Sequence, residues 1–160
     1  MPALGGVPMR LTLQQYCTGR TDDSIRYPSW DSLVALTCDQ VLVDVTEGHY
    51  QGDYWYLLRR GEEYGYVIVG YGSCSGCDTL QAVEGDFDAE YRLGLEVEQR
   101  IQWFPTPSAC LAYLANKDWA LEYNASVAFL DQARAVLLPL CGDDDLVRSW
   151  LTPVKWKVRQ

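Results

Sequence analysis

The stretch that decides the fold is Asp53–Tyr71, which reads DYWYLLRRGEEYGYVIVGY. Residues 53–58 and 64–71 are rich in Tyr, Trp, Val and Ile, the residue types that favour β-strands. The connection between them, residues 59–63, contains a glycine, and a glycine-containing connection of this length is typical of a β-hairpin. The sequence therefore predicts an antiparallel hairpin with aromatic strands.

On the N-terminal side of this hairpin, the sequence predicts a third strand and a helix. Valine recurs at every second position of residues 41–46, which is the period of a half-buried strand, and residues 48–52 read as the following turn. Ser29 is placed to cap a helix that continues to Leu36. Residues 1–9 show no such pattern and are expected to form a loose arm.

The C-terminal side is predicted to be mostly helical, and a capping residue marks the start of each helix. Alternation of apolar and basic residues over 154–159 then predicts a last strand that returns to the sheet. The predicted N-caps are Asp78, Asp86 or Asp88, Thr106 followed by Pro107, and Ser126, the last with Gly142 ending its helix.

These elements predict an α+β fold in one domain spanning residues 1–160. We expect a small antiparallel sheet of about four strands, with the aromatic hairpin at its centre and the helices packed mainly on one face. The length of 160 residues and the hydrophobic fraction of 48% suffice for a sizeable core.

The charge of the chain limits its partners. The formal net charge is -9, so nucleic acid and anionic membranes are disfavoured, and a protein with a basic surface is favoured. The sequence contains neither an export signal nor a run of about 18 apolar residues, which predicts a cytoplasmic protein without a membrane partner. It leaves a homodimer open.

The most distinctive segment is Gly70–Asp78, GYGSCSGCD, which leaves the second hairpin strand and enters a predicted helix. Glycine permits backbone angles that other residues resist, so this loop is able to turn sharply. Asp78 and Gln81 approximate a capping box. Cys77 lies just ahead of the helix N-terminus, where the helix dipole favours a thiolate.

Four interpretations of this loop remain open. It is structural, with small thiols packed beneath a glycine turn, or Cys74 and Cys77 form half of a zinc site, or they form a redox dithiol. In the fourth, Gly70, Tyr71, Gly72, Ser73, Gly76 and Asp78 bind an anion or a nucleotide-like ligand. For zinc, the missing ligands would come from a second subunit or from Cys17, Cys38, Cys110, Cys141 or His49.

Enzymatic chemistry is disfavoured. His49 is the sole histidine, so most hydrolase triads are excluded, and a papain-like pairing of Cys74 with His49 has the wrong order along the chain. Residues 143–145 are three successive aspartates without the spacing of a calcium loop, and they read as a solvated turn. Lys155, Lys157 and Arg159 would lie on an edge strand and prevent it from pairing with other chains.

Residues 50–54, 64–66 and 70–78 together resemble a motif of a protein family of bacteriophages and some actinobacteria. The resemblance covers about Tyr50 to Val83, and Gly-Ser-Cys-Ser-Gly-Cys-Asp is its most specific part. The family has no established activity, so the resemblance implies no catalytic residues. It implies a small intracellular accessory protein, phage-encoded, of a kind that acts on a host or defence protein.

The leading functional hypothesis is therefore a protein without enzymatic activity that binds a basic partner through acidic, Tyr- and Trp-rich surface. A phage accessory protein or an anti-defence inhibitor would act in this way. The two alternatives are a zinc or redox dithiol protein that uses the Cys-x-x-Cys loop, and a binder of a small nucleotide-like ligand.

Overall fold

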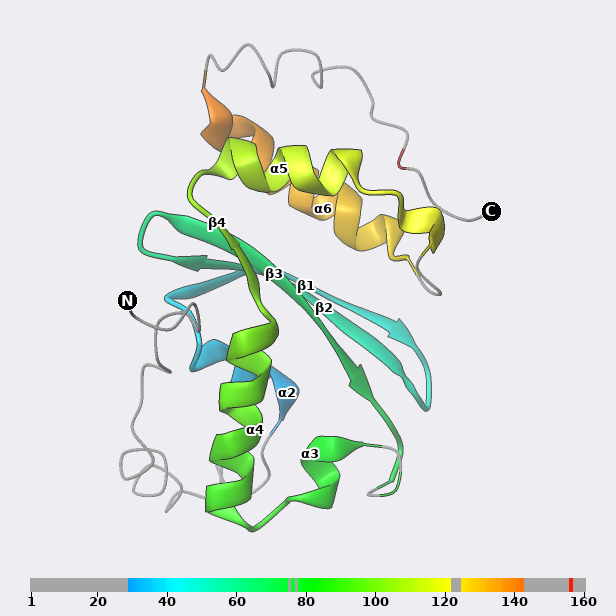
Figure 1. The fold of residues 1–160 in the computed structure, drawn as a ribbon. Helices are drawn as coiled ribbons and strands as arrows, with labels where there is room; N and C mark the ends of the chain where they lie inside the picture. Colours follow the sequence, from blue (N-terminus) through cyan, green and yellow to red (C-terminus); the bar gives the residue numbers. More distant parts are fainter. Residues whose placement is uncertain (1–28, 75, 77, 122–124, 143–155, 157–160) are drawn as a thin grey trace.

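The computed structural model describes residues 29–74, 76, 78–121, 125–142 and 156 (Figure 1). It confirms an α+β fold around one four-stranded antiparallel sheet. The elements are α2 (Trp30–Ala35), β1 (Gln40–Gly48), β2 (Gly52–Arg60), β3 (Glu63–Tyr71), α3 (Thr79–Ala82), α4 (Phe87–Arg100), β4 (Gln102–Phe104), α5 (Pro107–Asn116), α6 (Val127–Leu137), and the 3₁₀ turns η1 (Trp119–Leu121) and η2 (Leu138–Cys141).

The predicted aromatic hairpin forms the centre of the sheet, whose strand order is β1-β2-β3-β4. The ladder of β2 and β3 closes at the pair Arg60 and Glu63, so the turn is shorter than the predicted five-residue connection. Gly61 takes the left-handed backbone angle, φ 59°, that this tight turn needs. The predicted strand over residues 41–46 is confirmed as part of β1.

Helices cover both faces of the sheet, whereas the sequence analysis placed them mainly on one. Successive residues of a strand point to opposite faces. Trp55 and Leu57 accordingly lie in a core with α5 and α6, while Tyr56 and Leu58 lie in a second core with α2, α3 and α4. Figure 1 shows the two groups of helices on opposite sides of the sheet. The expectation of one covered face was wrong, because β2 is apolar on both.

The predicted helix starts are confirmed at every described helix. Each N-cap side chain accepts a backbone N–H of the first turn, and this is the local interaction on which the predictions rested. The N-caps are Ser29, Asp78, Asp86, Thr106 and Ser126. Among the described residues, the helices are all too short or too polar to cross a membrane.

The fourth strand comes from Gln102–Phe104, a segment for which the sequence analysis predicted no strand. It pairs with Tyr64–Tyr66 of β3. The strand predicted over residues 154–159 lies outside the described residues except for Trp156, which is not in a strand. The Trp156 indole is buried, belongs to the hydrophobic core that contains α5 and α6, and donates a 2.7 Å hydrogen bond to Asp131 of α6.

Candidate functional site

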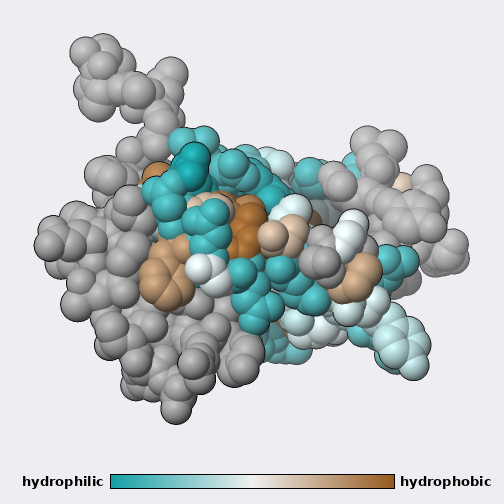
Figure 2. Space-filling view, turned by 90° about the horizontal axis from the view of Figure 1, so that it is seen from below, coloured by the Kyte–Doolittle hydropathy of each residue, from teal (hydrophilic) through white to brown (hydrophobic). Residues whose placement is uncertain are grey.

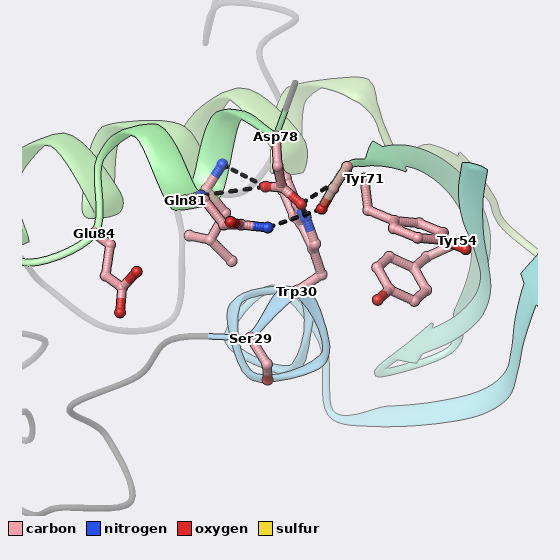
Figure 3. A pocket seen from close by; sticks show the side chains of 9 residues that line it. Ser29, Trp30, Tyr54, Tyr71, Asp78, Gln81 and Glu84 are labelled. Atoms are coloured by element: carbon pink, nitrogen blue, oxygen red, sulfur yellow. Dashed lines mark hydrogen bonds between the residues drawn. The ribbon is translucent and has the colours of Figure 1, made fainter. Parts of the chain in front are cut away.

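The Asp78 carboxylate connects the end of β3, the start of α3 and, from a distant part of the sequence, helix α2. Its Oδ2 accepts hydrogen bonds from the backbone N–H of Gly72, at 3.0 Å, and from the Trp30 indole, at 3.4 Å (Figure 3). Its Oδ1 accepts from the backbone N–H of Leu80 and of Gln81, at 2.9 and 3.2 Å. Because Asp78 is only 5% exposed, these four bonds replace its hydration.

The glycine-rich loop closes on itself through the same residues. The backbone N–H of Asp78 donates to the carbonyl of Cys74 at 3.0 Å, and the Gln81 side chain donates to the carbonyl of Gly72 at 2.8 Å. The described part of the loop is therefore fixed between the end of β3 and the start of α3, and the structural interpretation of the loop has a direct physical basis.

Two tyrosines lie beside this loop. The rings of Tyr54, from β2, and Tyr71, from β3, stack with their centroids 4.4 Å apart and their planes at 29°. The Tyr71 hydroxyl shares its one proton between the carbonyl oxygens of Glu47 and His49, each 3.3 Å away. Tyr71 therefore connects the loop to the end of the β1–β2 hairpin, and both rings are half-buried.

A hollow of about 190 Å³ opens between the tyrosine pair, the start of α2 and α3. In Figure 3, the tyrosines lie at one end of this hollow, Glu84 at the other, and Trp30 and Asp78 between them. The described residues that line it include three aromatic rings and two carboxylates but neither lysine nor arginine; they are Ser29, Trp30, Tyr54, Tyr71, Gly72, Asp78, Leu80, Gln81 and Glu84.

The electrostatic environment of the hollow is negative. Burial raises the pKa of the Tyr54 phenol, and Tyr71, Asp31 and Asp78 raise it further, because nearby negative charge opposes ionisation. Asp31, an exposed residue of α2, accepts a 2.6 Å hydrogen bond from the Tyr56 hydroxyl. Figure 2 shows the molecule from the side of α3 and α4, where hydrophilic residues surround a small hydrophobic area.

Of the site residues predicted from the sequence, the structure brings Tyr71, Gly72 and Asp78 together at the hollow. Gly70, Ser73 and Gly76 are exposed and do not line it, and Cys77 lies outside the described residues. The sequence analysis missed Trp30 and Tyr54, which come from other elements. The strand period could have indicated Tyr54, since it shares a face of β2 with Tyr56.

The described cysteines differ in exposure. Cys74 is exposed, whereas Cys38, Cys110 and Cys141 are buried. Burial, and secondarily Cys141, raise the pKa of Cys110 to about 12, so this thiol is protonated at neutral pH. Within the described part of the chain, His, Cys, Asp and Glu form no group of three or more that could hold a metal ion. The zinc and dithiol hypotheses depend on Cys77 and stay predictions, as does the turn at residues 143–145.

A second hollow, of about 230 Å³, lies at the end of the β1–β2 hairpin, beside Ala125. It is lined by Glu47, Gly48, Gln51, Gly52, Asp53 and Ala125. Burial raises the pKa of Asp53. The Ser126 hydroxyl, which caps α6, donates to Glu47 at 2.5 Å, so we attribute Glu47 to the attachment of α6 to the hairpin.

Comparisons with protein-family models, with curated proteins and with solved structures returned no match.

Proposed function

We propose that this protein binds a basic partner protein and holds a lysine or arginine side chain of that partner in the hollow beside Tyr54 and Tyr71. The observation that carries the proposal is the composition of the hollow. Aromatic rings and carboxylates line it, and none of its described lining residues is basic.

The chemistry of the hollow suits a cation. The face of an aromatic ring attracts an ammonium or guanidinium group, and the attraction grows when the cation is desolvated. Tyr54 and Tyr71 offer the exposed parts of their rings, and Trp30, 6% exposed, lies in the wall. Asp78 and Glu84 add negative charge, and the net charge of -9 attracts a basic surface over a longer range.

The size and hydrogen bonding of the hollow favour a side chain over a nucleotide. Sites for small molecules typically enclose about 300–1,000 Å³, whereas this hollow measures about 190 Å³. The amides that would bind a phosphate, those of Gly72, Leu80 and Gln81, already donate to Asp78. A bound anion would also meet that carboxylate.

The biological role that we propose is that of an accessory protein that modulates a host or defence protein by binding it. The net charge of -9 and the resemblance of residues 50–83 to phage proteins support this role. A basic protein of the host is therefore the partner class to test first.

The test is a calorimetric titration of the full chain with an eight-residue peptide of alternating glycine and lysine, which measures the binding affinity. Tyr54→Leu removes the ring, and we expect it to weaken binding roughly fivefold, because a cation–π contact contributes about 1 kcal/mol. Tyr54→Phe keeps the ring and should bind within about twofold of the parent. Glu84→Gln should weaken binding, whereas Glu96→Gln, an exposed acid on α4 that does not line the hollow, should not.

Circular dichroism first establishes that each variant is folded. Failure of the parent chain to bind the lysine peptide would overturn the proposal. Equal affinity of Tyr54→Leu and the parent would do so as well, and so would equal binding of a peptide with glutamate in place of lysine.

A further inference from the structure

The outer edge of β1 is a separate surface. None of the described residues that line the hollow beside Tyr54 and Tyr71 belongs to β1. β1 is the terminal strand of the sheet, is nine residues long, and has one buried residue, Val43. In an antiparallel ladder, an edge strand turns the N–H and C=O of every second residue away from its neighbour. Among the described residues, none outside the sheet makes a backbone–backbone hydrogen bond to Gln40–Gly48.

Among the described residues, the opposite edge of the sheet is covered by more of the chain than β1 is. Tyr64–Tyr66 of β3 pair with β4, which is only three residues long. Farther along β3, the Arg100 guanidinium of α4 donates a 2.7 Å hydrogen bond to the carbonyl of Ile68. Short edge strands and side chains that occupy backbone groups are devices that prevent pairing with other chains.

The charges of β1 distinguish between possible occupants. Its two charged side chains, Asp44 and Glu47, are both acidic, whereas lysine commonly guards natural edge strands. A second copy of this chain would bring further carboxylates against them, and like charges on adjacent strands repel. A basic strand would bring opposite charges. The bulge between Val41 and Val43 interrupts the first part of the edge and leaves Val43–Gly48 regular.

We propose that Val43–Gly48 accept an extended lysine- or arginine-rich segment of another protein as a fifth strand of the sheet. Main-chain hydrogen bonds to β1 supply affinity that is independent of side chains. Asp44 and Glu47 point to opposite faces, and Glu47 already accepts a hydrogen bond from Ser126. A segment whose basic residues all point to the face of Asp44 therefore matches the edge. The partner class agrees with the proposed function, but the surface is a different one.

The experiment measures amide hydrogen exchange of the full chain with and without an eight-residue peptide of alternating valine and lysine. We expect the peptide to slow the exchange of amides within Val43–Gly48. Two further peptides, N-methylated at the odd or at the even residues, separate strand pairing from charge attraction. In one of these two peptides the N-methyl groups replace the N–H donors that face β1. We expect that peptide to leave the amides of Val43–Gly48 unprotected. Full protection with both N-methylated peptides, or with glutamate in place of lysine, would overturn the proposal.

Two charge-reversal variants test the role of the acidic side chains. Asp44→Lys should weaken binding of the valine–lysine peptide by roughly three- to tenfold, since opposite-charge pairs on adjacent strands stabilise and like-charge pairs destabilise. Glu96→Lys changes the net charge equally but lies on α4, so it should have less than about twofold effect. Equal effects of the two variants would show that only net charge matters and would contradict pairing at β1.

Two other occupants would also overturn the proposal. If the edge accepts a second copy, protection of Val43–Gly48 rises with protein concentration and a dimer appears in sedimentation. If the C-terminal residues of this chain occupy it, the amides of Val43–Gly48 are already protected in the free monomer. We expect a monomer whose β1 edge exchanges rapidly until the basic peptide is added.

Discussion

At the residue scale, Asp78 is the side chain on which the hollow most depends. It caps α3, fixes the end of β3 through Gly72 and orients the Trp30 indole, all from one buried carboxylate. A carboxylate that accepts this many hydrogen bonds can be buried because its lone pairs are satisfied. Its role is architectural, and its charge also contributes to the negative environment of the hollow.

Replacing Asp78 with alanine should lower the free energy of unfolding by about 2–4 kcal/mol. A lost N-cap costs about 1 kcal/mol, and the buried donors left without an acceptor add the rest. Asp86→Ala is the matched control, since Asp86 is exposed and makes one capping bond, so about 1 kcal/mol is expected. Denaturant unfolding measures both, and equal losses would contradict the role given to Asp78.

Tyr56 should make stability sensitive to alkaline pH. Burial and the hydrogen bond to Asp31 raise the pKa of its phenol above the usual value. The folded protein thus retains a proton that the unfolded chain, with a tyrosine pKa of about 10, releases. This contribution to stability is complete below about pH 10 and is lost as the pH rises beyond it.

Tyr56→Phe should therefore lower the free energy of unfolding by about 1 kcal/mol at neutral pH, because one hydrogen bond is lost. The variant should also show a shallower loss of stability above about pH 10 than the parent. Urea unfolding at several pH values gives both quantities. Tyr50→Phe, at a side chain that is 84% exposed, should change neither. An unchanged alkaline slope in Tyr56→Phe would contradict the assignment.

At the element scale, the attachment of β4 to β3 depends on a glycine. A Cβ placed on Gly65 would lie 2.7 Å from the Trp103 ring and 2.9 Å from the carbonyl of Gln102. Only glycine therefore allows β4 to approach β3 this closely, and β4 in turn holds Trp103, over which the Arg60 guanidinium lies 4.2 Å from the ring centroid.

Gly65→Ala should destabilise the protein by about 1–3 kcal/mol, because the strands must move apart. Gly70→Ala is a matched substitution in the same strand, where a Cβ would find its nearest neighbour at 3.7 Å, so the change should stay within about 0.5 kcal/mol. Thermal unfolding of the two variants measures the difference in their stability. A Gly65→Ala protein as stable as Gly70→Ala would show that the approach of β4 is not close.

The elements also show what the sequence could predict. The hairpin and the helix starts follow from local signals, such as Thr106 before Pro107, and the structure confirms them. β4 was missed because three residues carry too little pattern. The two-sided burial was missed although Trp55–Leu58 form an unbroken apolar run, which is a sign of a strand covered on both faces.

The hollow was only half predictable for a related reason. Tyr71, Gly72 and Asp78 lie within eight residues of one another, so the loop motif identified them. Trp30 and Tyr54 reach the same place from α2 and β2, and only the packing of those elements against β3 brings them there. No local signal marks Glu84, an exposed acid among several.

At the scale of the whole molecule, the account describes a sheet with a hydrophobic core on each face and acidic surface at both proposed binding sites. The hollow lies on the α2–α3 side, and β1 is an edge of the sheet to which, in the described part of the chain, no further strand pairs. Both the hollow and the β1 edge are proposed to bind a basic partner. Long-range attraction by a chain of net charge -9 should therefore contribute to association.

The glycine–lysine peptide should accordingly bind less tightly as salt is added. Between about 0.1 M and about 1 M sodium chloride the screening length falls from about 10 Å to about 3 Å, so attraction between exposed charges is largely removed. We expect the affinity to fall several-fold, with a cation–π contribution remaining. Calorimetry at the two salt concentrations measures this, and affinity independent of salt would contradict the electrostatic part of the account.

The most direct test of the central claim is an NMR measurement on the full chain with the glycine–lysine peptide labelled in its lysine side chains. The account predicts nuclear Overhauser effects between the lysine ε-methylene protons and the rings of Tyr54 and Tyr71, with those protons shifted upfield by the ring currents. A bound peptide whose lysine side chains show neither the contacts nor the shift would contradict it.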